Sequence, residues 1–344
     1  MTRTLTRRQC LGTAGLAGVA LGCNETPAAN SMATGARSAP PRVSGRPLPR
    51  ATTPVAASAP RAPETTPSSG ALPRRQDAPP WAEVPFPATA FFPEEHALIL
   101  RRGVGDVLVA LHGRGEVDKG LQGGARGWRD DYRLDRALER VTAPPLVSAD
   151  LLGFVTSRRL AALNASLAAH PYRGIAVACP WAPALEDRSP RATEPFARFL
   201  IEDLVPRARR EAAGMNPPSR RTGIDGVSMG GRLALLIGLR HPDVFDTIGA
   251  LQPAIRPGEV DEIVGLARDA QRRREGALAL RLVTSTGDYF RGAVRALSAA
   301  LERAAVPHEL VETPGPHNYA YNRGPGAYEL LLWHERLLRG LPPP

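Results

Sequence analysis

The pattern of apolar and polar positions divides the chain into two parts. From about Trp81 to the end, short apolar runs alternate with segments in which apolar residues recur every three or four positions. The short runs predict buried strands and the second kind predict amphipathic helices, as at Leu134, Leu138 and Val141. Before residue 81 neither pattern forms a folded unit, so we expect one folded domain over residues 81–344.

The predicted elements alternate along this domain. Strands are expected at 98–100, 107–111, 175–179, 221–225, 247–251, 278–285 and 308–312, and helices at 134–141, 149–169, 194–213, 232–240, 259–272, 294–301 and 328–338. This alternation favours an α/β fold with a mostly parallel sheet covered by helices on both faces. In such a sheet, reactive side chains are expected at the carboxyl ends of the strands.

The first 23 residues are typical of an export signal. Three arginines, Arg3, Arg7 and Arg8, precede an apolar run at 11–22 that is shorter than the roughly 20 apolar residues that cross a bilayer. Residues 6–11 resemble a twin-arginine signal and residues 20–23 resemble a bacterial lipobox, which implies a lipid on Cys23. The alternative is a buried N-terminal helix.

Residues 24–80 consist mainly of Pro, Ala, Ser, Thr, Gly and Arg, with almost no large apolar residue. Such a segment cannot bury enough surface to offset its ordering entropy, so it is predicted to be a flexible tether. The alternative is a disordered leader without a function. Together the two segments predict a bacterial cell-envelope protein that meets the membrane only through a lipid.

Cysteine and charge narrow the possibilities further. Of the three cysteines, Cys179 alone lies in the predicted domain, which excludes a disulfide within that domain and favours an inert core residue. The net charge of +10 comes almost entirely from scattered arginines. Scattered charge favours a solvated surface, so we expect no nucleic-acid partner, and we expect no metal and no cofactor.

Gly226-Val227-Ser228-Met229-Gly230 has the pattern G-x-S-x-G between a predicted strand and a predicted helix. This context is typical of a nucleophile elbow, in which a sharp turn holds the serine in a strained backbone conformation. Small residues are needed two positions before and after the serine, and the helix that follows directs its N-terminal amides at a developing oxyanion. The alternative is an ordinary glycine-rich turn.

An acid and a base follow the serine in the chain. Asp288 lies just after the strand predicted at 278–285, and His317 lies in a Gly/Pro-rich loop after the strand predicted at 308–312. The order Ser228, Asp288, His317 is that of α/β-hydrolases. A serine hydroxyl needs a base to take its proton, and a carboxylate orients that base. Other candidates for the acid are Asp243, Asp246 and Asp261.

Further candidates surround this predicted triad. Gly113 and Met229 are predicted to supply backbone N–H groups to the oxyanion, and His112 is expected to shape the turn rather than to act as a base. Candidate substrate-binding residues are His112, Arg114, Trp128, Trp181, Gln252 and Tyr319. The remaining histidines, His96, His170, His241, His308 and His334, are expected on surfaces, at caps or at strand starts.

The elbow, residues 199–206 before it, residues 241–245 after it, and the Gly-Asp and Gly-Pro-His loops resemble the esterase D and feruloyl-esterase-like group of α/β-hydrolases. The resemblance implies a serine esterase acting on a small or polymer-linked ester. Acyl transfer by the same triad and a non-catalytic binding module are the alternatives. We expect an open or half-open site, since residues 252–277 supply one short helix that can wall a pocket but is too small for a broad apolar lid. We expect the helix at 149–169 near the opposite edge of the sheet.

Overall fold

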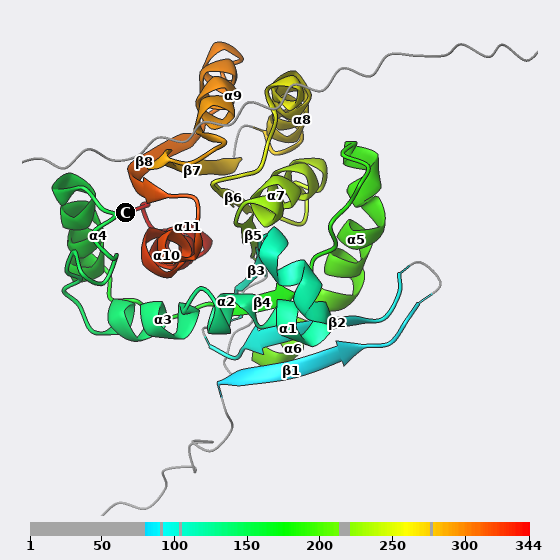
Figure 1. The fold of residues 1–344 in the computed structure, drawn as a ribbon, viewed down its shortest axis with the longest axis horizontal. Helices are drawn as coiled ribbons and strands as arrows, with labels where there is room; N and C mark the ends of the chain where they lie inside the picture. The colour runs from blue at the N-terminus through cyan, green and yellow to red at the C-terminus, as the bar shows by residue number, and fades with distance from the viewer. Residues whose placement is uncertain (1–79, 90–91, 103–104, 213–220, 276–277) are drawn as a thin grey trace, which may run out of the picture. The chain divides into compact units, whose positions relative to one another are not determined.

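Eight strands form one sheet in the order β1-β2-β4-β3-β5-β6-β7-β8 in the computed structural model (Figure 1). The strands are β1 (Trp81–Phe86), β2 (Glu95–Leu100), β3 (Val107–Leu111), β4 (Ala176–Pro180), β5 (Thr222–Gly226), β6 (Thr247–Leu251), β7 (Ala279–Gly287) and β8 (Glu309–Pro316). β1 and β2 pair antiparallel at one edge, and β4, β3, β5, β6, β7 and β8 are parallel. The predicted mostly parallel α/β sheet is therefore confirmed.

The structure describes residues 80–89, 92–102, 105–212, 221–275 and 278–344. The predicted export signal, the lipidation candidate Cys23 and the tether lie outside the described residues. Those assignments, with the boundaries at 23 and 80, stay predictions.

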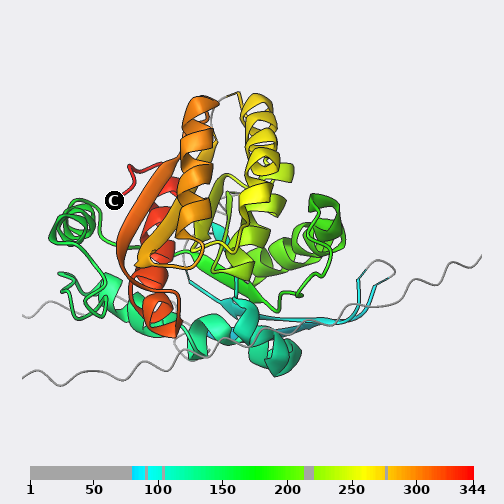
Figure 2. The same ribbon diagram turned by 45° about the horizontal axis from the view of Figure 1, so that its top comes forward.

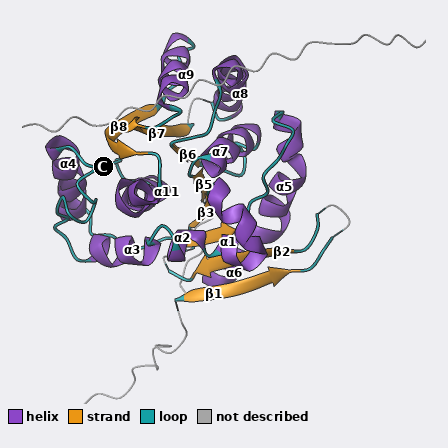
Figure 3. Cartoon of the chain, viewed as in Figure 1, coloured by secondary structure: helices purple, strands orange, loops and turns teal. Residues whose placement is uncertain are grey.

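Helices cover both faces of the sheet (Figure 3). One face carries α5 (Glu194–Arg198), α6 (Val205–Ala212), α7 (Met229–Arg240), α8 (Val260–Arg273) and α9 (Arg291–Arg303). The other carries α2 (Gly127–Asp130), α3 (Leu134–Thr142), α4 (Ser157–Ala169) and α11 (Ala327–Leu338). Figure 2 shows α8 and α9 packed side by side. Each face buries its own apolar cluster against the strands, which is the arrangement that a parallel sheet requires.

Short helical segments complete the described chain. They are α1 (Gly120–Ala125), α10 (Tyr319–Tyr321), the 3₁₀ turns η1 (Arg114–Lys119), η2 (Pro190–Thr193) and η4 (Pro257–Glu259), and the π-helical turns η3 (Phe199–Leu204) and η5 (Asn322–Gly326). The pattern of apolar residues did not predict α1, α2 or η1, because they are too short to show a helical period.

The helix predicted at 149–169 begins only at Ser157, where the Thr156 side chain caps it by accepting the Arg159 N–H at 3.2 Å. The residues before it lie beside the loop that carries His317, because a Cβ on Gly315 would be 3.1 Å from Phe154 Cγ. The expectation that this segment lies near the opposite edge of the sheet is wrong for its N-terminal part. Side chains join α4 to α11, with Arg159 bonded to Glu329 and Arg336 bonded to Ser166.

Strand β1 was not predicted either. Its residues alternate between buried and exposed, and Pro85 lies in an edge strand, where a missing N–H costs no ladder hydrogen bond.

None of the helices in the described ranges is long and apolar enough to cross a membrane. Cys179 is buried in β4, and burial raises the pKa of its thiol, which agrees with the inert core residue that was predicted.

Candidate active site

Ser228 lies in a strained turn between β5 and α7. Its backbone has φ 57° and ψ −114°, a conformation that side-chain-bearing residues seldom adopt. The Ser228 N–H donates to Leu251 O at 2.9 Å, and the Ser228 carbonyl accepts the N–H of Ala254 at 2.9 Å. These two bonds fix the turn from the neighbouring strand β6, so that the strain at Ser228 is held by the surrounding structure.

The two glycines of the motif are required by the close packing of this turn. A Cβ on Gly226 would lie 2.5 Å from the carbonyl carbon of Gly230, and a Cβ on Gly230 would lie 2.5 Å from His112 O. Real Cβ atoms do not approach backbone this closely, so any larger residue would displace the elbow from β3. The predicted strand, sharp turn and helix are all present.

The structure brings Ser228, His317 and Asp288 together in one chain of hydrogen bonds. His317 Nε2 lies 3.0 Å from Ser228 Oγ, and His317 Nδ1 lies 2.7 Å from Asp288 Oδ1. The residues come from the ends of β5, β7 and β8, which meet at the carboxyl edge of the sheet. The chemistry of this geometry is proton transfer from the hydroxyl to the imidazole, with the carboxylate holding the ring.

Asp288 is well supported as the partner of the imidazole. Its side chain is fully buried, Oδ2 accepts from Thr284 Oγ1 at 2.7 Å, and Oδ1 also accepts the Phe290 N–H at 2.9 Å. These donors hold the carboxylate in one orientation. The other candidate acids lie elsewhere: Asp243 pairs with Arg273, Asp246 with Arg274, and Asp261 is exposed on α8.

Two aromatic rings flank the imidazole of His317. The ring of Tyr289 lies 5.3 Å and that of Phe290 5.4 Å from it, measured between ring centres. Tyr289 is 82% exposed, so the imidazole is covered on this side by a ring that itself faces solvent. The His317 side chain is 13% exposed, which leaves it accessible from the side of the serine.

The two predicted oxyanion donors differ in their surroundings. Met229 is the first residue of α7, where backbone N–H groups have no acceptor within the helix. The Gly113 N–H, in contrast, donates to Tyr132 Oη at 3.0 Å. The next residue, Arg114, begins η1, so its N–H is also without an acceptor within its own turn. The turn after β3 therefore offers the Arg114 N–H more readily than that of Gly113.

A cavity of about 300 Å³ opens beside the serine. It is lined by Gly113, Arg114, Gly115, Glu116, Tyr132, Val227, Ser228, His317, Asn318, Tyr319 and Asn322. Arg114 and Tyr319 are thus the two predicted substrate-binding residues that reach it. Helix α8 contributes nothing to this lining and instead buries Ile263, Ala267 and Ala270 in the core, so the expectation that it walls the pocket is wrong.

The structure does not bring the other four candidates into this cavity. Trp128 is buried behind Tyr132, with their rings edge to face at 5.0 Å. Trp181 donates its indole N–H to Val117 O at 3.2 Å. Gln252 is buried, and its amide donates to Ser285 Oγ at 2.7 Å and to Pro316 O at 3.1 Å, which ties the histidine loop to β7. These contacts support the site from behind.

The neutral imidazole of His112 holds the turn after β3 through two hydrogen bonds. Its Nε2 accepts the Ala182 N–H at 2.8 Å, so the proton is on Nδ1, which donates to Gly113 O at 2.8 Å. Burial lowers the pKa of His112 to about 4. These bonds agree with the expectation that His112 shapes the turn. His112 does not line the cavity.

Glu116, Tyr132, Asn318 and Asn322 line the cavity but were not predicted as site residues. Glu116 and Tyr132 come from short elements without a periodic pattern. One signal was available: Glu116 follows Gly113-Arg114-Gly115 directly, so a turn there places it near the serine. The part of the chain that the structure describes contains no cluster of His, Cys, Asp and Glu that could hold a metal ion.

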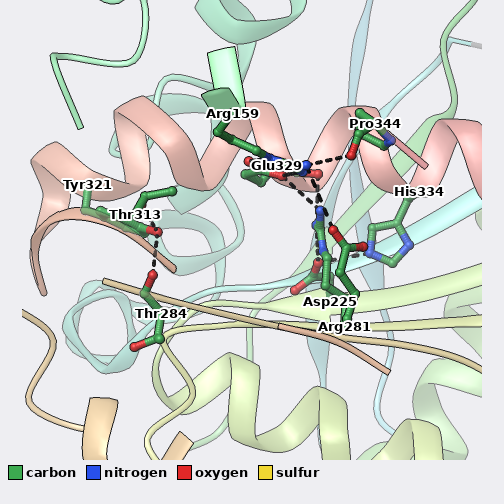
Figure 4. A network of polar contacts seen from close by, with 10 residues as sticks. Arg159, Asp225, Arg281, Thr284, Thr313, Tyr321, Glu329, His334 and Pro344 are labelled. Atoms are coloured by element: carbon green, nitrogen blue, oxygen red, sulfur yellow. Dashed lines mark hydrogen bonds and ion pairs between the residues drawn. The ribbon is translucent and has the colours of Figure 1, made fainter. Parts of the chain in front are cut away.

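A second histidine, His334 of α11, lies in a buried polar network behind the elbow (Figure 4). Its Nε2 bonds Asp225 Oδ2 at 2.9 Å and its Nδ1 bonds Thr247 Oγ1 at 2.7 Å. Arg281 and Glu329 continue the network. The expectation of a surface, cap or strand start is therefore wrong for His334, because the helix that carries it is buried almost all round.

The fold, the strained serine and its hydrogen-bonded partners define an α/β-hydrolase with the site of a serine hydrolase. Residues 181–323 match the family model described as "Putative esterase", and this region includes the three residues of the predicted triad. Over this region the chain is similar to that esterase family. A comparison with curated protein sequences gives no match.

Solved structures with the same fold include enzymes of this kind. A ferulic acid esterase shares 14% identity with a TM-score of 0.53, and the match covers 72% of this chain and 95% of that one. A fluorophosphonate-binding serine hydrolase of Staphylococcus aureus shares 13% identity with a TM-score of 0.51, covering 73% of this chain and 96% of that one. At these identities the likeness shows the shared fold alone.

Proposed function

We propose that this serine hydrolase cleaves short-acyl or aryl carboxylic esters through an acyl-enzyme formed on Ser228. The observation that carries the proposal is the unbroken chain from Ser228 Oγ through His317 to Asp288, which opens into a cavity. The hydroxyl, the imidazole and the carboxylate are in the order and at the distances that nucleophilic catalysis requires.

In the proposed reaction, His317 Nε2 takes the proton of Ser228 Oγ as Oγ attacks the ester carbonyl carbon. The imidazolium then gives that proton to the departing alcohol oxygen, which leaves an acyl group on Ser228. A water molecule, deprotonated by the same nitrogen, attacks this acyl group and releases the acid. Asp288 Oδ1 accepts the Nδ1–H throughout and stabilises the positive ring.

The negative charge on the carbonyl oxygen needs N–H donors beside Ser228. The Met229 N–H at the start of α7 supplies one, supported by the positive end of the helix dipole. The turn after β3 supplies the other N–H, which comes from Arg114. The Gly113 N–H can serve instead if it releases its bond to Tyr132.

The size of the site supports small substrates. The cavity of about 300 Å³ lies at the lower end of the range for ligand pockets. No described helix covers it in the manner of a broad apolar lid, since the lining comes from loops and short turns. Activity is therefore expected to rise smoothly with substrate concentration. A strong preference for emulsified long-chain triglycerides would contradict this part of the proposal.

A fluorophosphonate probe tests the chemistry, because it labels an activated serine and not an inert one. The wild-type protein is expected to be labelled and the Ser228→Ala variant is not. A panel of short-acyl, aryl, sugar and polymeric esters then identifies the substrates. Capture of the acyl group by an added alcohol, in preference to water, would instead support the alternative of acyl transfer.

We also propose that the protein is exported and carries a lipid on Cys23. The support is the arginine pair, the short apolar run and the Pro/Ala-rich segment that follows. Metabolic labelling with a tagged fatty acid should mark the wild type. A Cys23→Ala variant that is labelled and membrane-bound to the same degree would rule the proposal out.

A further inference from the structure

The cavity beside Ser228 has a buried carboxylate in its wall. Glu116, from η1, is 1% exposed, and its Oε2 accepts a short hydrogen bond from Tyr132 Oη. A Cβ on Gly113 would lie 3.4 Å from Glu116 Oε2 and 3.8 Å from Ser228 Cβ. Gly113 therefore separates the carboxylate from the serine by little more than the width of one backbone segment.

The second oxygen of this carboxylate, Oε1, is buried and accepts no hydrogen bond within the described residues. Lys119 Nζ forms an ion pair with it at 3.8 Å, beyond hydrogen-bond distance, and the Tyr319 hydroxyl lies beside the same carboxylate, where burial and the Glu116 charge raise the pKa of Tyr319. Buried carboxylate oxygens are normally hydrogen-bonded, because an unpaired one loses its hydration without compensation. Since Glu116 lines the cavity, a group bound there can supply the missing donor.

A second unpartnered group lines the same cavity. Asn322 is 8% exposed, and its Oδ1 has no hydrogen-bond partner in the described part of the chain. The residues that line the cavity thus include two buried oxygens, Glu116 Oε1 and Asn322 Oδ1, that accept no hydrogen bond within the described residues.

The missing hydrogen-bond donor could be an ammonium group or a hydroxyl group, and the charges around the cavity favour the hydroxyl. Arg114 lines it, Lys119 lies near Glu116, and the Arg323 guanidinium is 6.0 Å from the ring of Tyr319. The nearby carboxylate of Asp131 is already paired with Lys119 at 2.6 Å. These cations would repel an ammonium group that entered the cavity. A neutral hydroxyl group would not be repelled.

We propose that Glu116 Oε1 accepts a hydrogen bond from a neutral hydroxyl group of the substrate, whose own oxygen accepts one from the Asn322 amide nitrogen, so that hydroxylated esters are preferred over their deoxy analogues. The inference rests on the proposed ester hydrolysis and names its substrate class. A hydroxyl that donates to a buried carboxylate forms a charge-assisted bond, and an analogue without the hydroxyl leaves the carboxylate unpaired. We therefore expect a preference of about tenfold or more.

Matched pairs of esters test this substrate class. The para-nitrophenyl esters of β-hydroxybutyrate and butyrate place or omit a hydroxyl on the acyl side. The butyrate esters of ethylene glycol and propanol do the same on the alcohol side. For the wild type, kcat/KM should favour the hydroxylated member of at least one pair by about tenfold or more. Equal values in both pairs would overturn the inference.

Glu116→Gln keeps an oxygen for Tyr132 and replaces the unpartnered oxygen by an amide nitrogen. It should lower the hydroxyl preference, measured as the ratio of the two kcat/KM values, by about tenfold, whatever it does to the absolute rates. Glu139→Gln is the matched control, because it makes the same chemical change at a side chain of α3 that is 70% exposed and does not line the cavity. The control should leave the ratio unchanged.

The possible outcomes separate the two proposals. Fluorophosphonate labelling and hydrolysis without any hydroxyl preference would leave the esterase proposal standing and overturn this one. No labelling and no hydrolysis of any ester would overturn the proposed function itself. An unchanged ratio in Glu116→Gln, or a preference for the para-nitrophenyl ester of γ-aminobutyrate over both other acyl groups, would overturn the hydroxyl site. If Glu116→Gln fails to fold, Asn322→Leu is the second variant and should lower the same ratio.

Discussion

Two histidines of this domain each lie between a hydroxyl and a carboxylate, in surroundings that make them chemically different. His317 joins Ser228 to Asp288 at the carboxyl edge of the sheet, and His334 joins Thr247 to Asp225 in its interior. The distances within the two groups are similar, at 2.7 to 3.0 Å. A hydroxyl, an imidazole and a carboxylate in contact therefore do not by themselves make an active site.

The differences lie in the orientation of the ring and in access. His317 presents Nε2 to the hydroxyl and Nδ1 to the carboxylate, and His334 does the reverse. Ser228 has a strained backbone and lines a cavity, whereas Thr247 is 2% exposed and lies within the regular strand β6. The strained elbow, the helix N-terminus and the cavity are what the interior group lacks.

The interior group has a structural role that its neighbours make clear. Asp225 Oδ1 accepts the Gly226 N–H at 2.7 Å, and Arg281 Nη1 donates to Glu329 Oε2 at 3.0 Å. The Arg281 guanidinium also lies 4.5 Å from the ring of Trp333. These contacts join β5, β6, β7 and α11 directly behind the elbow, so the network holds the strand that carries Ser228.

Removing Ser228 or His317 from the catalytic group should have the largest effect on activity. Ser228→Ala and His317→Ala are each expected to lower kcat by about 10⁴-fold or more, and the double variant should lose little beyond either single change. Both side chains line the cavity, so the melting temperature should change little. Steady-state kinetics and calorimetry check both statements. Substantial turnover by Ser228→Ala would show that another residue is the nucleophile.

Asp288→Asn tests the orienting carboxylate with almost no change in shape. The amide can no longer accept the Nδ1–H and stabilise the positive ring as the carboxylate does, so kcat should fall by about 10³- to 10⁴-fold. Fluorophosphonate labelling should slow in parallel. If this variant retained the wild-type rate, the acid would have been assigned wrongly.

At the interior group the matching change should act on stability. Glu329→Gln removes the full charge that faces Arg281, and both side chains are completely buried. Breaking a buried ion pair from one side costs about 3 to 5 kcal/mol, because a charge remains without compensation. Urea unfolding should show this loss, while kcat for the protein that is folded stays close to that of the wild type. A large fall in kcat without any loss of stability would mean that the network serves catalysis directly.

The group at the carboxyl edge of the sheet could be predicted from the sequence because each of its members follows a strand directly. In a parallel sheet, strand ends meet at one edge, so Ser228, Asp288 and His317 had to lie near one another. The interior group could not be predicted in this way. His334 and Glu329 lie in a helix whose charged residues are read as its solvated side, and only the packing of α11 onto the sheet shows that they are buried.

The same limit explains the substrate-binding residues. Trp128 and Trp181 lie on loops near the predicted edge, and nothing in the sequence states which way a loop side chain points. Glu116 belongs to a 3₁₀ turn of six residues, too short for a periodic pattern. Its position depends on the bond to Tyr132, which comes from a separate element. Contacts of this kind are fixed by tertiary packing alone.

The smallest expected effect is a loss of stability in acid that comes from His334. Burial lowers the pKa of His334, with a smaller effect of the same sign from Arg281 and an opposing effect from Asp225. A histidine with a lowered pKa in the folded state binds protons more readily once unfolded. Below the ordinary value of about 6.5, the unfolded state therefore takes up more protons, and the free energy of unfolding falls by up to about 1.4 kcal/mol for each pH unit.

This contribution of His334 is complete above about pH 6.5 and is lost as the pH falls toward the lowered value. Urea unfolding of the wild type and of His334→Gln, between about pH 7 and about pH 5, isolates the term, because the remaining titrating groups are common to both proteins. The wild type should lose more stability than the variant over this range. Parallel curves would mean that His334 takes up its proton inside the folded protein, and the reactive and the structural histidine would then differ in access alone.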